Sequence, residues 1–340
     1  MQKKINSRMV IVFVILVVLV IFSFLINLCM GNVQMDLKTI TQILITGAGD
    51  EKSKNIIMDI RLPRAIMTLV LGGALAVSGF LLQTYFSNPI AGPYILGISS
   101  GAKMTVALFL IFVVGTTGRS SSGLLIIAAF VGSIIATGFI ILISRSVKNM
   151  ASLLAAGIMI GYICSAVTDF LIAFADDSDI VNLHSWSQGS FSGSNMNGAF
   201  YSIIIVGISM IFVMILSKSL DAFRLGENYA RSVGVNIRLC RVVIILLSSI
   251  LSACVTAFAG PVSFIGIAVP FLMRESLKSS KPIVLIPASF LSGSIFCLIS
   301  DLIARRIFAP TELNISAVTS LFGAPIVIFM IIRRHRNHEN

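Results

Sequence analysis

Few side chains in this sequence have the types and spacing that chemistry requires. The chain holds no GxxxxGKS/T phosphate loop, no HExxH zinc motif and no GxSxG nucleophile elbow. Of its three histidines, His335 and His338 lie in a basic C-terminal tail. Its five cysteines stand singly in apolar stretches, without the CxxC spacing of a metal or redox site. We therefore expect no catalytic residue, no metal site and no cofactor bound by this chain.

Three ionisable residues lie inside apolar stretches, where a charge usually marks a functional site. Asp301 precedes Arg305 by four residues, which places both on one helical face and favours an ion pair over a proton relay. Asp169 lies near the outer end of its stretch, within reach of water. Lys103 lies near the middle of its stretch, where it either faces a watery pathway or pairs with a helix end; both interpretations stay open.

Membrane-spanning helices must position these residues. The 340-residue chain is 56% hydrophobic and only 11% charged, whereas roughly a quarter of a soluble domain is charged. Uncharged stretches of about 20 residues fit single crossings, and Asn88-Pro89 and Gly260-Pro261 divide two longer ones. We predict an all-α polytopic membrane protein, a single transmembrane domain over 1–340. Its ten spans are 9–30, 62–85, 92–114, 122–144, 149–174, 198–217, 238–258, 263–275, 282–304 and 313–333, with a loop at 218–237.

The positive charges predict the orientation. The formal net charge is +11, and placing both termini in the cytoplasm puts most lysines and arginines on that side, as the positive-inside rule requires. Such an excess indicates contact with the bilayer; no basic run is interleaved with aromatic residues, so nucleic-acid binding is not expected. Arg61, Arg64 and Arg305 fall at helix ends on the outer face, against the rule. An external partner would explain them.

The loop at 218–237 contains an amphipathic stretch, Leu220 to Gly234. Glu227 and Arg231 are spaced for an i, i+4 pair, and glycines bound the segment, which is long enough for two short helices at a turn. Such a helix suits docking in a groove of another protein or resting on lipid headgroups, and the spacing alone leaves both open.

Short motifs follow one another in a specific order between residues 9 and 333. They are Arg61-Leu-Pro-Arg64, Gly73-Ala-Leu-Ala-Val-Ser-Gly79 with Leu82-Gln83, Asn88-Pro-Ile-Ala91, Leu96-Gly-Ile-Ser-Ser-Gly-Ala102, Leu154-Ala-Ala-Gly-Ile-Met-Ile-Gly161, Cys164-Ser-Ala166, Trp186 with Gly189-Ser190 and Gly193, Gly226 to Gly234, Gly260-Pro-Val-Ser-Phe-Ile-Gly266 with Pro270 and Arg274, Asp301-Leu-Ile-Ala-Arg305 and Gly323-Ala-Pro325. In this order they resemble the FecCD-like permeases, the type II transmembrane subunits of iron-siderophore, haem and vitamin B12 ABC importers.

The resemblance implies a permease that moves an iron chelate, foremost a ferric siderophore, across the bacterial plasma membrane. It implies a second permease copy or a paralogue, two cytoplasmic ATPase subunits that use ATP and Mg²⁺, and an external substrate-binding protein. It assigns binding-protein docking to the outer arginines and apolar path lining to the fifth span. The implied site residues are Arg61, Arg64 and Arg305 for docking; Arg224, Gly226, Glu227, Ala230, Arg231 and Gly234 for ATPase coupling; and Met159, Tyr162 and Asp169 for the path.

Two positions depart from the family pattern. Phe271 stands where the family commonly has histidine after a proline, and Lys103 replaces a small or apolar residue. Haem or vitamin B12 import on the same fold is the nearest alternative function, and an ion-coupled secondary transporter is the alternative from another class. The sequence distinguishes neither the chelate nor homodimer from heterodimer.

Overall fold

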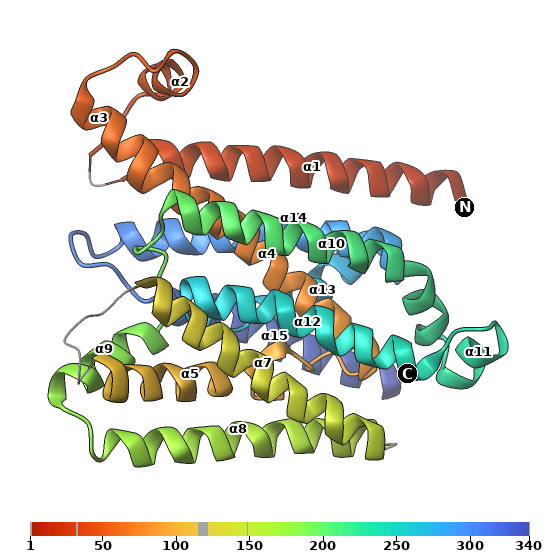
Figure 1. The fold of residues 1–340 in the computed structure, drawn as a ribbon. Helices are drawn as coiled ribbons and strands as arrows, with labels where there is room; N and C mark the ends of the chain where they lie inside the picture. The colour runs from red at the N-terminus through yellow and green to blue at the C-terminus, as the bar shows by residue number, and fades with distance from the viewer. Residues whose placement is uncertain (1, 32, 115–121, 148, 340) are drawn as a thin grey trace.

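The computed structural model describes residues 2–31, 33–114, 122–147 and 149–339, and only helices and loops occur in these ranges. Figure 1 shows helices of membrane length lying roughly side by side. Eight are long and apolar enough to cross a membrane. The helices are α1 (Gln2–Cys29), α2 (Leu37–Thr46), α3 (Glu51–Asn55), η1 (Ile56–Arg61), α4 (Leu62–Tyr85), η2 (Pro93–Leu96), α5 (Ile98–Phe109), η3 (Leu110–Val114), α7 (Ser122–Ser146), α8 (Met150–Ile172), α9 (Asp177–Ser187), α10 (Met196–Arg224), α11 (Glu227–Ser232), α12 (Ile237–Ala259), α13 (Ile265–Leu277), α14 (Pro282–Arg306) and α15 (Ile315–Glu339).

Helix α4 is the core of the bundle, packed against α10, α12, α13 and α14. Small residues on α4 allow close helix approach. A β-carbon on Gly79 would lie 1.8 Å from the carbonyl oxygen of Gly266 in α13, and one on Gly72 would lie 2.7 Å from the carbonyl oxygen of Gly293 in α14. Backbone-to-backbone packing of this kind is typical of membrane helices. The hydrophobic effect does not drive helices together inside a bilayer, so their association depends on close packing.

The two ends of the bundle, called the α11 end and the α2 end after a helix that lies at each, carry different elements. The α11 end carries both chain termini, and the opposite α2 end carries α2, α3 and α9 (Figure 1). Helices α3, η1 and α4 run on without a break over Glu51–Tyr85. Pro63 has no N–H to donate one turn back, and here the helix widens to a π turn in which Leu62 N donates to Ile57 O.

Each of the ten predicted spans overlaps helical structure, with 92–114 divided among η2, α5 and η3, and 62–85 has the same bounds as α4. That all ten cross a membrane stays a prediction. The breaks at Asn88-Pro89 and Gly260-Pro261 are confirmed, because α4 ends at Tyr85 and α12 at Ala259. The predicted loop 218–237 was too long, since α10 continues to Arg224 and α12 starts at Ile237. Between them lies one short helix, α11, rather than two.

Candidate functional site

Arg61, at the α2 end, is 4% exposed and is held by backbone carbonyls. Its guanidinium donates to the carbonyl oxygens of Leu28 at 2.6 Å and Cys29 at 3.1 Å, and to that of Val33. These carbonyls lie at and after the C-terminal end of α1, where free carbonyls favour a cation. No carboxylate bonds to Arg61 in the described ranges. The carbonyl oxygens accept its hydrogen bonds but do not neutralise its positive charge.

Arg64, Asp301, Arg305 and Glu312 form a compact ionic network beside Arg61. Arg64 Nη2 lies 2.9 Å from Asp301 Oδ1, and its Nη1 lies 3.0 Å from Glu312 Oε1. Asp301, 1% exposed, also approaches Arg305, whose Nε lies 3.1 Å from Asp301 Oδ2. A second Arg305 nitrogen donates to the Asn27 amide oxygen. The predicted Asp301–Arg305 ion pair is therefore confirmed.

The docking assignment of Arg61, Arg64 and Arg305 stays a prediction, and the structure adds a condition to it. All three are at least nine-tenths buried and have partners within this chain. No local pattern indicates Asn27 or Glu312 as partners, because Asn27 is 278 and Glu312 is 248 residues from the arginine it contacts. Arg306, not among the predicted residues, is exposed at the same end and donates to the carbonyl of Gly31 at 3.1 Å.

The predicted coupling residues lie together at the α11 end. Arg224 ends α10, and Gly226, with φ +113°, lets the chain turn into α11. Gly234, with φ +87°, makes the turn that leads to α12. Ala230 lies on the inner face of α11 and is fully buried, whereas Arg224 and Arg231 are exposed.

The i, i+4 spacing indicates a pair between Glu227 and Arg231, but the structure does not contain this pair. Glu227 pairs with Arg241 of α12 at 2.5 Å, because α11 folds back onto the start of α12. Four arginines and this single carboxylate line a cleft of about 350 Å³ between α7, α11 and α12. The arginines are Arg145, Arg231, Arg238 and Arg241. The cleft is thus strongly basic.

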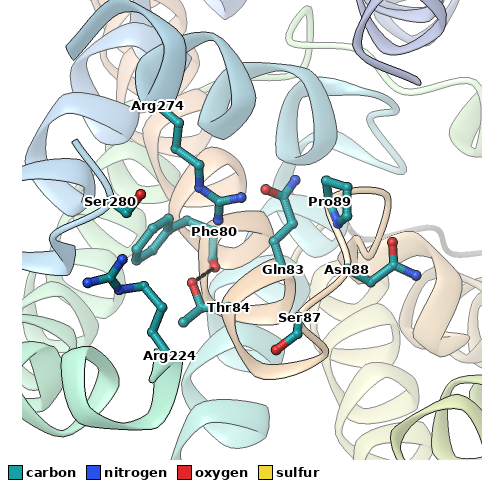
Figure 2. Close-up of a pocket in the computed structure, with 9 residues that line it drawn as sticks. All are labelled: Phe80, Gln83, Thr84, Ser87, Asn88, Pro89, Arg224, Arg274 and Ser280. Carbon is teal, nitrogen blue, oxygen red and sulfur yellow. Dashed lines mark hydrogen bonds between the residues drawn. The ribbon is translucent and has the colours of Figure 1, made fainter. Parts of the chain in front are cut away.

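A second cavity at the α11 end, of about 370 Å³, lies where α4, α10 and α13 end. Figure 2 shows Arg224 and Arg274 pointing toward it from opposite sides of the Phe80 ring. The Arg274 guanidinium lies over that ring, 5.6 Å from its centroid. The remaining lining residues are polar or small: Gln83, Thr84, Ser87, Asn88, Pro89 and Ser280.

The predicted path residues share one stripe of α8. Met159, Tyr162 and Asp169 are all exposed, in a helix that packs only one face against α5, α7 and η2. Gly157 and Gly161 lie on the packed face, against the turn at Gly97. The GxxxG spacing of these two glycines therefore serves helix packing.

The two departures from the family pattern lie in the interior of helices. Lys103 is half-buried in α5 and forms no ion pair within the described residues. Phe271 is half-buried in α13, directly after Pro270.

A bundle of membrane-length helices with charged, shaped ends defines a polytopic membrane protein, and comparisons with known proteins agree. The FecCD transport family model matches residues 18–333. The hemin transport system permease HmuU of Yersinia pestis is 31% identical over 100% of both chains. The vitamin B12 import permease BtuC of Vibrio vulnificus is 33% identical over 83% of this chain and 84% of its own. The solved structure of an ABC transporter assigned to the metal-chelate type, in an inward-facing conformation, superposes with a TM-score of 0.84 at 27% identity, over 95% of this chain and 99% of that one.

The chain belongs to the FecCD transport family. It is therefore a membrane-spanning permease subunit of an ABC importer, a class that works with a separate ATPase and a binding protein.

Proposed function

We propose that this permease imports a ferric siderophore across the bacterial plasma membrane. A solved relative at 27% identity has been assigned to the metal-chelate type. In the described part of this chain, no three His, Cys, Asp or Glu side chains come together to hold a metal. Iron would thus pass with its chelating shell intact, along a wall that binds it weakly.

The exposed stripe of α8 is the observation that carries this proposal. An uncovered face with Met159, Tyr162 and a single carboxylate, Asp169, suits a path between two permease copies, or between this chain and a paralogue. The α11 end would face the cytoplasm with both termini, and two ATPase subunits that use ATP and Mg²⁺ would bind there. An external binding protein would dock on the arginines of the α2 end.

Haem is the second candidate cargo, because one relative that matches over its full length is a hemin permease. Vitamin B12 is the third, because another relative is a vitamin B12 import permease. Reconstitution of the chain with its ATPase and binding protein in liposomes, with labelled ferric siderophore, haem and cobalamin in parallel, tests the choice. ATP-dependent uptake of ferric siderophore alone supports the proposal. Uptake of haem or cobalamin instead replaces the cargo, and uptake driven by an ion gradient without ATPase overturns the mechanism.

A further inference from the structure

Arg274, near the end of α13, has no counter-ion among the residues that the structure describes. It is partly buried and lies over Phe80, which is 1% exposed. Within the described ranges it makes no ion pair and no hydrogen bond to another residue. Of the buried arginines, Arg64 contacts two carboxylates and Arg305 contacts one, and Arg61 donates to three backbone carbonyls. A partly buried guanidinium without an anion gives up hydration that no partner replaces, so Arg274 needs an explanation.

The cavity beside Arg274 concentrates positive charge. Arg224 points into it from the end of α10, and no aspartate or glutamate is among its lining residues. The ion pair of Arg224 with Asp221 is exposed on its own helix, so water weakens it. Side chains of Ser87, Asn88 and Ser280 line the cavity and can donate hydrogen bonds. A cavity of about 370 Å³ that is lined by two cations and by neutral hydrogen-bond donors is suited to bind an anion.

The position of the cavity indicates where the anion comes from. It opens where α4 ends, and α4 is surrounded by four other helices instead of lying at the bilayer perimeter. A phospholipid headgroup would need a site at that perimeter. Arg224 also belongs to the segment that leads into α11, so a protein docked on α11 would reach the cavity.

We propose that this cavity is a socket for an acidic side chain of the ATPase subunit, gripped by Arg274 and Arg224. The inference rests on the proposed function, in which the ATPase docks at the α11 end. A carboxylate fits because guanidinium groups bind it through two parallel hydrogen bonds. The socket lies at the end of α4, and Gln83 of α4 bonds to the carbonyl oxygens of Gly266 and Ile267 at the start of α13, at 3.3 and 3.1 Å. A carboxylate held there would connect the ATPase to the core of the bundle.

The test is Arg274→Gln, measured in two ways. The affinity of the purified permease for its ATPase should fall at least about tenfold, with a weaker dependence on salt, because one partner of a desolvated charge pair is lost. The melting temperature of the permease alone should stay the same or rise, because the substitution removes an uncompensated charge. Arg224→Gln, on an exposed side chain, should reduce ATPase affinity in the same direction. Lys281→Gln, exposed at the same end but outside the cavity, is the matched control and should change neither quantity.

Several outcomes separate the socket from the proposed function. If α11 substitutions abolish ATPase binding while Arg274→Gln leaves it unchanged, the socket is wrong and the function stands. If the wild-type chain binds no ATPase, the proposed function fails first. If Arg274→Gln instead abolishes stabilisation by phosphatidylglycerol vesicles at unchanged ATPase affinity, the anion is a lipid and the proposal is overturned. A large loss of thermal stability with no change in affinity would assign Arg274 to the fold.

Discussion

Asp301→Asn should destabilise the chain severely, because this carboxylate serves two buried guanidiniums. Asp301 lies 2.9 Å from Arg64 and 3.1 Å from Arg305, and it is 1% exposed. Two arginines and two carboxylates balance in the network; after the substitution Glu312 alone would face two positive charges. Breaking a buried pair on one side costs about 3–5 kcal/mol. We expect a loss in that range in the free energy of unfolding.

Glu312→Gln is the matched control within the same network. The Glu312 side chain is 39% exposed, and its contact with Arg64 at 3.0 Å competes with water. Exposed pairs contribute about 0–1 kcal/mol, so the two single substitutions should differ by several-fold. Denaturant unfolding of the detergent-purified chain, at one detergent concentration, measures both. Equal losses of less than about 1 kcal/mol would refute the buried network as a stabilising element.

Two further predictions concern packing and coupling. Gly79→Ala should lower the free energy of unfolding by about 1–3 kcal/mol or more, because the new methyl would meet the fixed carbonyl of Gly266 at 1.8 Å. Gly207→Ala, with open space around it, should cause no measurable loss, and denaturant unfolding compares the two variants. Glu227→Arg should remove the pair with Arg241, weaken ATPase association or uncouple hydrolysis from transport, and leave membrane insertion intact. Normal assembly and transport by that variant would remove α11 from the coupling site.

The transmembrane pattern could be predicted because apolar length and helix breakers are local properties. Pro63 near the start and Asn88-Pro89 after the end bracket α4, and the predicted span matched it. Helix α9 was not predicted, because Asp177–Ser187 is polar and an apolar window does not detect it. Helix α10 exceeds its predicted span by a turn and more, since nothing between 217 and Arg224 breaks a helix.

The same difference between local and long-range geometry separates the charged pairs that the sequence predicts from those that it does not. The Asp301–Arg305 pair was predicted because four residues of helix fix its geometry. The Arg64–Asp301 contact joins residues 237 apart in sequence and depends on how α4 meets α14. The predicted Glu227–Arg231 pair was wrong for the same reason, since the fold of α11 against α12 brings Arg241 closer than the helical spacing could reveal.

Docking at the α2 end makes different demands on its three arginines. Arg64 and Arg305 already have carboxylate partners, so a binding protein must displace these or add to them. Among the described residues, Arg61 donates to carbonyl oxygens and to no carboxylate, so its charge is left to attract an external carboxylate. If the three residues dock the binding protein, charge reversal at each should weaken binding by about 1–3 kcal/mol per well-formed pair.

Arg61→Glu should also lose stability, because a buried carboxylate would face the carbonyl oxygens of Leu28 and Cys29. Its loss of binding should nevertheless be the largest of the three, because no carboxylate of the described residues already pairs with Arg61. Arg64→Glu and Arg305→Glu should lose stability first, because each adds a third carboxylate to the network and leaves one arginine. A charge-swap double-mutant cycle with the carboxylates of the binding protein, at low and high salt, separates the two effects, since attraction between exposed charges is screened over about 8 Å at physiological salt. Partial rescue by the partner's reversal at Arg61, fading with salt, supports docking. Zero coupling at all three arginines, with affinity indifferent to salt, would leave them as structural residues that fasten α1, α4 and α14 together.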